Sequence, residues 1–416
     1  MDEYNVSSDI SPTGGQMGRA LGLALASKHY RARSEEFENS GFTEGGNEVC
    51  FCTIGDASTS EGVFWETVNA AVVMQVPLAV SVWDDGYGIS VPRELQTAKG
   101  SISKALSGMG SDEDGSGLDI YTVKAWDYPE LCALYERAIA RVRETHIPAL
   151  VHVEECTQPQ GHSTSGSHER YKSKDRLEWE EQSDCITVMA HWMITSGIST
   201  EEEIAEIKTQ AKKYVREAKQ RAWANLAQPV LQMRTEALGL IAQLPESARS
   251  DEGISAKIVE LEKLIDPQYA EVLHAVKNIY YGVLHTFSAQ ELTPIRDWIK
   301  GHDADRRQKY STHLYSDHAT SALRVPVVAA EYDESKPVNG YQVLNAFFDK
   351  KLGDDPRIVA FGDDVGHIGD VNQGFAGLQE KHGDLRVFDT GIREWTIMGQ
   401  AIGLSMRGFR PIAEIQ

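Results

Sequence analysis

The alternation of apolar and polar residues predicts a strand, a helix and a second strand between residues 49 and 83. Val49 to Ile54 is a short run of β-favouring residues, and Leu78 to Trp83 is a mostly apolar run that begins directly after Pro77. Between the two runs, apolar residues recur at the spacing of one buried helical face, at Phe64, Val68, Ala71 and Val72. These elements form a parallel β-α-β unit, whose ligands bind at the carboxyl ends of the strands.

Acidic turns follow both predicted strands. Gly55-Asp56 comes directly after the first strand, and Asp84-Asp85-Gly86 comes directly after the second. Ser58, followed three residues later by Glu61, has the spacing of a capping box, so we expect the helix to begin there. Both acidic turns should therefore lie side by side, next to the N-terminus of a helix.

This arrangement indicates a phosphate site that contains a metal ion. The free amides of Ala57 and Ser58 would bind phosphate oxygens. The carboxylates of Asp56 and Asp85 would repel a phosphate unless a divalent cation lies between them, and Mg²⁺ binds protein carboxylates together with substrate phosphates. The same residues are equally consistent with a helix cap and a tight Asp-Gly turn. By themselves they leave both interpretations open.

The rest of the chain alternates helical and strand patterns. Residues 11–27 predict a helix of small residues, whose glycines allow close packing against another element. Residues 88–117 are rich in glycine and serine and are expected to form a mobile surface loop. Residues 129–143 have the pattern of an amphipathic helix, and residues 150–154 that of another strand. Residues 228–331 are mostly helical and polar, and connect the two ends of the chain.

Composition and charge exclude some classes of function. The chain has 416 residues, of which 41% are hydrophobic, so it can form two or three domains. A net charge of −21 argues against nucleic acid and anionic membranes as partners and favours a basic partner surface. Met1 to Val6 is no signal peptide, and no apolar run approaches the length of a membrane helix. Five cysteines without paired metal-ligand spacing indicate reduced thiols and a cytoplasmic location.

The first acidic turns also carry a family resemblance. The stretch resembles the thiamin diphosphate motif of the decarboxylating component of 2-oxo acid dehydrogenase complexes, which runs Gly-Asp-Gly, about 30 residues and then Asn-Asn. Here the spacing is 85 − 56 = 29 residues. The resemblance implies Mg²⁺ ligation by Asp56, Asp85 and the backbone carbonyl of Tyr87. It implies cofactor binding by residues 55–58. Two departures are Ala57 in place of glycine and Asp84-Asp85 in place of two asparagines.

Two later stretches extend the resemblance. Gly-His-Ser-Thr-Ser at residues 161–165 resembles the family's active-site loop, whose histidine lies by the diphosphate and the reacting carbon, and this role falls to His162. The arginine that precedes this loop in the family is replaced by residues 158–160. A metal pair of His162 and His168 is an alternative that no cysteine or carboxylate spacing supports. Residues 386–394 resemble the β subunit, and Glu394 matches the glutamate that hydrogen-bonds the cofactor's aminopyrimidine.

The resemblance implies a doubly wound α/β fold with three parts. Residues 1–226 would be an α-like thiamin diphosphate-binding domain, truncated at its N-terminus. Residues 227–335 would be a helical connector, and residues 336–416 the start of a β-like pyrimidine-binding domain, truncated at its C-terminus. We therefore expect a fragment of a single-chain fusion of the α and β subunits, nearly inactive alone.

The implied reaction is oxidative decarboxylation of a 2-oxo acid, with transfer of the acyl group to lipoyl-lysine of a transacylase. Glu394 and His162 are the expected catalytic residues. The Ser-Thr-Ser loop slightly favours branched-chain 2-oxo acids over pyruvate. Expected partners are the transacylase with its basic subunit-binding domain and, in the complete chain, a second copy. A transketolase-like enzyme and an inactive fragment that only binds partners remain alternatives.

Overall fold

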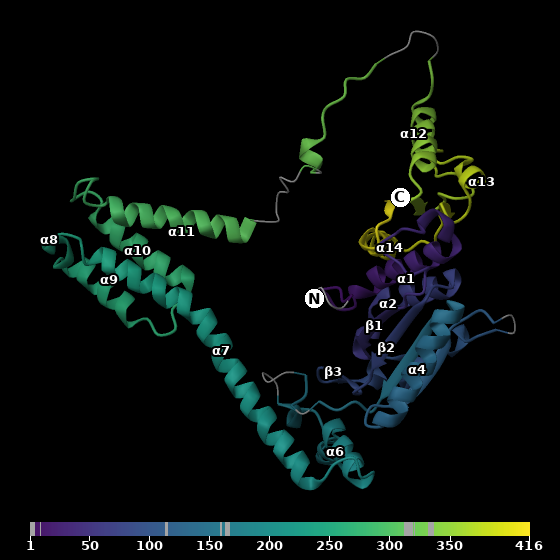
Figure 1. Cartoon of the computed structure of the whole chain (residues 1–416), viewed down its shortest axis with the longest axis horizontal. Helices are drawn as coiled ribbons and strands as arrows, with labels where there is room; N and C mark the ends of the chain where they lie inside the picture. Colours follow the sequence, from purple (N-terminus) through teal and green to yellow (C-terminus); the bar gives the residue numbers. More distant parts are fainter. Residues whose placement is uncertain are drawn as a thin grey trace. The chain divides into compact units, whose positions relative to one another are not determined.

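The computed structural model describes residues 5–8, 10–112, 115–158, 160–162, 167–311, 319, 321–331 and 337–416. The chain divides into two compact units, residues 1–199 with 334–416 and residues 200–333 (Figure 1). The expected boundary between residues 226 and 227 falls within one continuous helix, α7 (Glu201–Ile241). In the described part of the chain, no helix has the length and apolar character needed to cross a membrane.

A four-stranded parallel sheet is the centre of the larger unit. Its strands, in spatial order, are β1 (Cys50–Gly55), β2 (Leu78–Trp83), β6 (Ala149–Glu154) and β5 (Asp119–Lys124). The strands expected near residues 49–54, 78–83 and 150–154 are confirmed, whereas β5 was not predicted. Cys50 pairs with Leu78, so the first two strands start level and also end level. Their acidic turns therefore meet at one edge.

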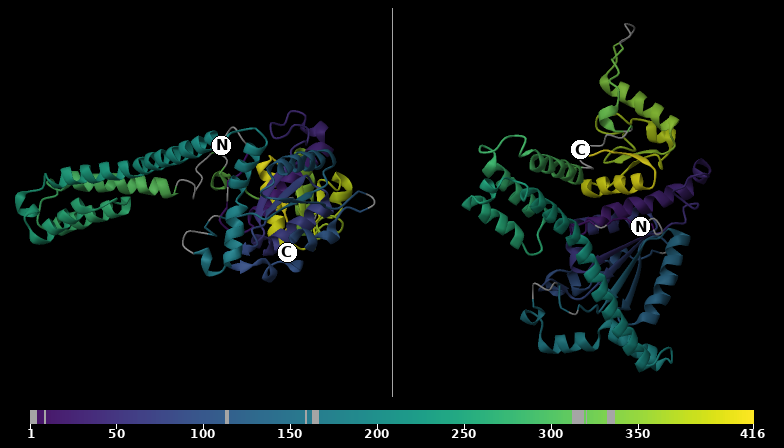
Figure 2. Two further views of the ribbon diagram at one scale, coloured as in Figure 1. Left: turned by 90° about the horizontal axis from the view of Figure 1, so that it is seen from below. Right: turned by 60° about the vertical axis from the view of Figure 1, so that its left-hand side comes forward.

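Helices cover both faces of this sheet, as the doubly wound fold requires (Figures 1 and 2). On one face, α1 (Gln16–Ala32) and α2 (Gly62–Met74) pack against side chains that include Val80 and Val82. On the other face, α4 (Tyr128–Thr145) packs against Val151 and Val153. Both faces are apolar because a parallel sheet is buried on both sides. The expected α/β fold class is confirmed for this unit.

The helix after β1 begins later than its sequence suggested. Residues 57–60 form a short 3₁₀ helix, η2 (Ala57–Ser60), and α2 starts only at Gly62. The reason is that Thr59 donates both its amide and its hydroxyl to the carbonyl of Asp56, which tightens the chain into a 3₁₀ turn. Glu61 then precedes α2 without a side-chain cap, so the capping box of Ser58 and Glu61 is wrong.

Residues 88–117 are not a surface loop throughout. Their described part contains buried Ile102 and Leu106, which join the main core, and buried Ser101 and Ser103. The serines are polar in sequence but hydrogen-bonded in the fold, which is why composition alone was misleading. The segment includes β3 (Tyr87–Gly88), β4 (Val91–Pro92), η3 (Arg93–Leu95), η4 (Ala98–Gly100), α3 (Ile102–Ala105) and η5 (Ser107–Met109).

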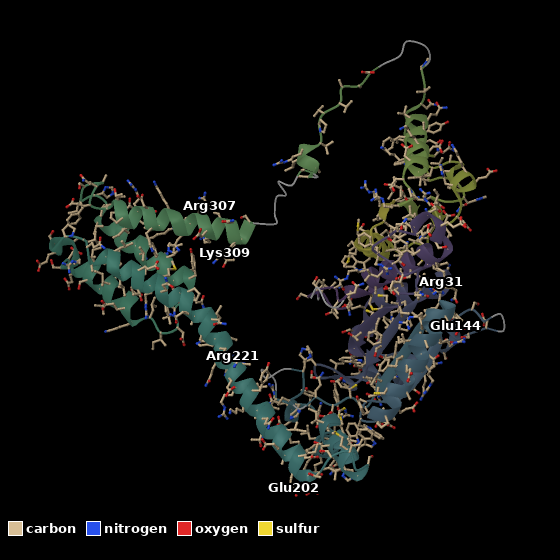
Figure 3. The ribbon with its side chains drawn as sticks, in the orientation of Figure 1. Arg31, Glu144, Glu202, Arg221, Arg307 and Lys309 are labelled. Carbon is tan, nitrogen blue, oxygen red and sulfur yellow. The ribbon has the colours of Figure 1, made fainter. Side chains whose placement is uncertain are left out.

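Several hydrogen bonds and short helices complete the α-like part of this unit. Arg31, at the end of α1, donates to the backbone carbonyl of Glu144 at the end of α4, over 3.2 Å (Figure 3). Two more helices follow β6, and the η helices at residues 34–37 and 168–170 are single turns. The helices after β6 are α5 (Lys174–Gln182) and α6 (Cys185–Thr195).

The C-terminal residues of the unit add a three-stranded parallel sheet. Its order is β8 (Val387–Asp389), β7 (Ile358–Gly362) and β9 (Arg410–Ala413). The helices of this part are α12 (Gly340–Asp354), α13 (Leu378–His382) and α14 (Glu394–Met406). Ile397 and Leu404 of α14 belong to the same core as α1, so the two parts share one interior.

Glycines bring α1 and α14 into close contact, as the small-residue pattern of α1 predicted. A Cβ atom on Gly22 would lie 2.1 Å from the backbone oxygen of Gln400, and one on Gly403 would lie 2.3 Å from that of Arg19. Gly18 and Gly399 face each other in the same way. The helix backbones therefore touch without intervening side chains.

Gly22→Ala is expected to destabilise the larger unit by about 1–3 kcal/mol, because the added methyl group has no space against a backbone atom. Urea unfolding would measure the loss. Gly353→Ala is the matched control, since Gly353 also lies in a helix but has nothing within 4 Å of its Cβ position. That control should be neutral or slightly stabilising. Equal effects of the two changes would contradict the close contact.

His29 is a buried histidine without polar partners in the described structure. Its side chain is 0% exposed, and neither ring nitrogen has a hydrogen-bond partner. The ring lies beside those of Phe388 and Phe409, with centroids 6.1 and 5.4 Å away. Burial, with the nearby charges of Arg33 and Lys28, lowers the pKa of His29 from 6.5 to about 3. The folded protein therefore holds this ring neutral.

Below pH 6.5 the unfolded chain binds a proton at His29 that the folded chain does not bind until about pH 3. Above pH 6.5 the protonation of His29 therefore does not reduce the free energy of unfolding. As the pH falls from 6.5 towards 3, the free energy of unfolding decreases. His29→Phe should remove this pH-dependent loss. The difference in unfolding free energy between the variant and the unmodified protein should therefore shift in favour of the variant when the pH is lowered from 7.5 to 5. Urea unfolding at the two pH values tests this, with exposed His367→Phe as the control. The same difference at both pH values would contradict it.

The smaller unit is a helical bundle with its own core. A capping box is present at the start of α7, because Thr200 and Glu203 exchange side-chain to backbone hydrogen bonds. Glu202 in the first turn adds a favourable negative charge (Figure 3). Ile207 and Tyr214 on this part of α7 are exposed, and the core forms further along. The other helices are α8 (Glu246–Arg249), α9 (Glu252–Lys263), α10 (Tyr269–Val283) and α11 (Thr293–Ser311).

Candidate cofactor and metal site

The ends of β1, β2 and β6 bring the acidic turns together, as expected from the sequence. The amide of Asp56 donates to the carbonyl of Trp83 over 3.0 Å, and the amide of Asp84 donates to that of Val153 over 2.9 Å. A Cβ atom on Gly88 would lie 2.9 Å from the Cβ of Ala57, so the turn after β2 closes over η2. The residues expected to hold a diphosphate and a metal ion therefore share one edge of the sheet.

Asp56 is a buried carboxyl group with an unsatisfied oxygen. It is 6% exposed, and its Oδ2 atom has no hydrogen-bond partner in the described structure. Burial, together with the negative charges of Asp84 and Asp85, raises the pKa of Asp56 from 3.8 to about 7. The amide of Ala57 opposes this shift by hydrogen-bonding to the carboxylate. A cation beside Asp56 would relieve both the burial cost and the repulsion.

Asp84 is a member of the site that was not assigned from the sequence. It is 3% exposed, and its Oδ2 atom lies 2.9 Å from Nε2 of His152 and 3.3 Å from Nη1 of Arg93. Burial alone would raise the pKa of Asp84, but the hydrogen bond from His152 and the neighbouring Arg93 outweigh it and lower that pKa. Its other oxygen, Oδ1, is buried without a partner.

Asp85 is held mainly through its backbone and its neighbours. Its Oδ1 atom accepts a hydrogen bond from the amide of Tyr87, and its carbonyl accepts one from Arg176 over 2.8 Å. Burial raises the pKa of Asp85, against that hydrogen bond and the charge of Lys172. The Nζ atom of Lys172 lies 5.0 Å from the ring centre of Tyr87 and forms a buried ion pair with Glu180. These contacts fix the turn that presents Asp85 and the Tyr87 carbonyl.

The side chains present fit a hard divalent cation together with phosphate oxygens. Asp56 and Asp84 each have a buried oxygen atom without a partner, and carboxylate oxygens are the donors that Mg²⁺ prefers. Within the described ranges, no group of three or more His, Cys, Asp and Glu side chains is arranged around one metal position. The Tyr87 carbonyl and the diphosphate would therefore complete the ligand set, as is usual for Mg²⁺.

The amides of Ala57 and Ser58 lie on the 3₁₀ turn η2, not at the N-terminus of α2. This corrects the local geometry expected for the diphosphate. Both residues are partly exposed next to Asp56, so an anion can reach them, although the Ala57 amide also hydrogen-bonds to the Asp56 carboxylate. Any help from the dipole of α2 is weaker than expected, because α2 starts five residues later than Ala57.

The two expected catalytic residues lie outside this carboxylate cluster. His162 is exposed, and the neighbouring Gly161 lies against Tyr171, whose ring is 5.7 Å from that of Tyr87. The base of the His162 loop thus reaches the turn that contains Tyr87, whereas residues 163–166 are outside the described part. Glu394 is the first residue of α14 and is exposed. The described contacts do not join Glu394 to His162 or Asp56.

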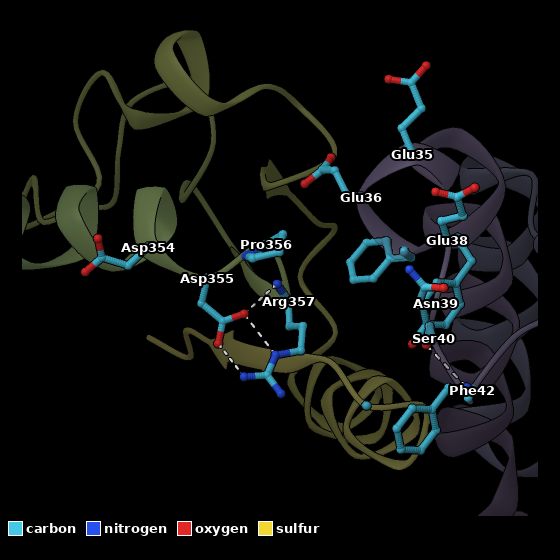
Figure 4. A pocket seen from close by; sticks show the side chains of 14 residues that line it. Glu35, Glu36, Glu38, Asn39, Ser40, Phe42, Asp354, Asp355, Pro356 and Arg357 are labelled. Atoms are coloured by element: carbon cyan, nitrogen blue, oxygen red, sulfur yellow. Dashed lines mark hydrogen bonds and ion pairs between the residues drawn. The ribbon is translucent and has the colours of Figure 1, made fainter.

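A separate cavity of about 680 Å³ contains none of the expected site residues. It lies between residues 35–42 and 354–357, and five of its 14 lining residues are acidic (Figure 4). One of its carboxylates is already paired, since Asp355 lies 2.8 Å from Arg357 and its pKa is lowered to about 2 by the hydrogen bond from that guanidinium. This cavity is therefore distinct from the site at the strand ends.

Comparisons with known proteins agree with the two halves of the chain. The family model described as dehydrogenase E1 component matches residues 3–230, and the one described as transketolase, pyrimidine binding domain, matches residues 336–416. Among solved structures, transketolase from Leishmania mexicana has a TM-score of 0.41 and 14% identity, covering 96% of this chain and 47% of that one.

Curated relatives include both subunits of one enzyme. The pyruvate dehydrogenase E1 component subunit alpha of Rickettsia bellii is 24% identical over 205 residues, 49% of this chain and 56% of that protein. The corresponding subunit beta of Acholeplasma laidlawii is 47% identical over 75 residues, 18% of this chain and 23% of that protein. The 2-oxoisovalerate dehydrogenase subunit beta of Pseudomonas aeruginosa is 45% identical over 75 residues, 18% of this chain and 21% of that protein.

The chain thus spans between about a fifth and just over half of the length of these relatives. It contains stretches similar to an α subunit and to a β subunit in one polypeptide. The first family model alone covers 230 − 3 + 1 = 228 of the 416 residues. The chain belongs to the dehydrogenase E1 component family.

Proposed function

We propose that this chain binds thiamin diphosphate with Mg²⁺ and serves in the oxidative decarboxylation of a 2-oxo acid, whose acyl group passes to lipoyl-lysine of a transacylase. The observation that carries the proposal is the buried carboxyl group of Asp56, whose Oδ2 atom has no partner in the described structure, at the carboxyl edge of a parallel sheet. Ligands of such sheets bind at that edge. Family membership supplies the kind of ligand and the reaction class.

In this proposal each site residue has a defined role. Asp56, Asp85 and the Tyr87 carbonyl hold Mg²⁺, and the amides of Ala57 and Ser58, beside Gly55, bind diphosphate oxygens. His162 would lie near the reacting carbon. The carboxyl group of Glu394 would hydrogen-bond the aminopyrimidine ring and hold a proton there. The cofactor, when bound, supplies the electron sink for decarboxylation. The protein side chains orient it, exclude water and hold protons.

The substrate and partners follow from the relatives and from charge. Relatives named for pyruvate and for 2-oxoisovalerate both match, and we propose a branched-chain 2-oxo acid as slightly preferred over pyruvate. A net charge of −21 suits a basic binding domain on the transacylase. We also propose a homodimer. Comparing decarboxylation rates for 3-methyl-2-oxobutanoate and pyruvate, with an artificial electron acceptor, tests the substrate preference.

The cofactor assignment predicts that thiamin diphosphate stabilises the protein only when Mg²⁺ is present. The buried carboxylates repel the diphosphate, and the cation removes that repulsion. At a hundredfold its dissociation constant, a bound ligand adds about 2.7 kcal/mol, which raises the melting temperature measurably. Thermal unfolding with Mg²⁺ and with EDTA tests this, with thiamin lacking the diphosphate as the control ligand. An equal rise in EDTA would rule out the metal-bridged site.

A further inference from the structure

Three carboxylates lie at the sheet edge where the diphosphate is proposed to bind, which leaves an excess of negative charge. Asp56, Asp84 and Asp85 follow the ends of two adjacent strands. One Mg²⁺ ion offsets two of these charges, and the diphosphate adds further negative charge. The site therefore needs positively charged or hydrogen-bond-donating groups from the protein. In the described structure, two such groups contact Asp84. These are His152 and Arg93, which share its Oδ2 atom.

His152 is fixed at both ring nitrogens. Its side chain is 0% exposed on β6, at the position that pairs with Val82 of β2. The Nε2 atom lies 2.9 Å from Asp84, and the Nδ1 atom lies 3.0 Å from Oγ of Ser103. Ser103 in turn lies 3.1 Å from the hydroxyl of Ser101. The ring cannot turn away from Asp84 without breaking this buried chain of hydrogen bonds.

We propose that His152 is a positioning residue for the cofactor site, which fixes Asp84 behind the metal-binding carboxylates and, with Arg93, offsets its charge towards the diphosphate. The inference rests on the proposed function. It explains how an acidic residue can stand at position 84 without repelling the cofactor. Asp84 Oδ2 is occupied by its two partners, and only Oδ1 remains open to the site.

The test is a set of variants at His152 and Asp84, read as the dissociation constant of thiamin diphosphate at saturating Mg²⁺. His152→Leu removes the donor and is expected to weaken binding roughly 10- to 100-fold, as for other groups that orient metal ligands. His152→Gln keeps a donor at a similar position and should recover most of this loss. Asp84→Asn combined with His152→Leu should also recover it, because the unpaired buried charge is gone.

His382→Leu is the matched control. His382 donates to Asp349 over 2.7 Å in another part of the unit, so its loss should leave cofactor affinity unchanged. If His152→Leu does not fold, Ser103→Ala removes only the support at Nδ1 and should weaken binding in the same direction. The inference about His152 would be overturned if the measured one of these two variants kept its cofactor affinity, or if adding Asp84→Asn did not restore it. Either result would leave the proposed function intact. No binding by the unmodified protein would overturn the proposed function as well.

Discussion

Glu394→Gln is expected to reduce turnover by roughly 10²- to 10⁴-fold while leaving the unfolding free energy nearly unchanged. A carboxyl group at this position would hydrogen-bond the aminopyrimidine and alternate between acid and carboxylate, which an amide cannot do. Glu394 is exposed and has no hydrogen bond or ion pair within the described residues, so its replacement breaks no side-chain contact. Steady-state decarboxylation assays and urea unfolding would measure the two effects.

The alternative role of Glu394 is a favourable charge in the first turn of α14. That role predicts near-normal turnover in Glu394→Gln and a stability loss of about 0.3–1 kcal/mol. Glu252→Gln is the matched control, because Glu252 is also exposed in the first turn of a helix, α9. If Glu394→Gln resembles this control in both measurements, the assignment of Glu394 as a catalytic residue is wrong.

Asp56→Ala should abolish metal-dependent binding of thiamin diphosphate and yet stabilise the metal-free protein. The change removes a proposed Mg²⁺ ligand, so we expect the dissociation constant to rise by at least about 100-fold. It also removes a buried oxygen without a partner and the repulsion from Asp84 and Asp85. Isothermal titration with Mg²⁺ present and thermal unfolding without it measure the two effects.

Weaker binding combined with higher stability of the metal-free protein is typical of a residue that binding requires but that destabilises the fold when no ligand is bound. Asp119→Ala is the control. Asp119 is ion-paired with Arg141 at the start of β5, so it lies at the amino edge of the parallel sheet, opposite the edge that contains the site. It should lose some stability and keep cofactor affinity. If Asp56→Ala destabilises the metal-free protein as Asp119→Ala does, Asp56 is a structural residue.

The sheet and its acidic edge could be predicted because they depend on local patterns. A strand, a buried helical face and a second strand are visible in residues 49–83, and the parallel pairing of β1 with β2 then places Asp56 beside Asp84 and Asp85. The start of α2 could not be predicted. The Ser58 to Glu61 spacing fits a cap, but the bonds of Thr59 to Asp56 favour a 3₁₀ turn instead.

The partners of Asp84 could not be predicted from one sequence. His152 is 68 residues away, and only the register of β6 beside β2 brings it within 2.9 Å. Ser103 lies in a segment whose composition indicated a loop, yet it is buried and hydrogen-bonded to His152. Long-range pairing of this kind leaves no periodic signal, whereas the small-residue spacing in α1 did predict its close helix contact.

The contact between α1 and α14 has a consequence for folding order. The hydroxyl group of Tyr30 donates a hydrogen bond to the carbonyl of Arg407, which lies 377 positions further along the chain. Thr200–Asp333 lengthens the loop that this contact closes by less than a doubling, so it adds less than about 0.6 kcal/mol to the closure entropy. The main effect of this separation is on the kinetics of folding, because the contact can form only late in synthesis. During synthesis, the glycine face of α1 remains uncovered until α14 has left the ribosome, and this is when the nascent chain is most exposed to aggregation.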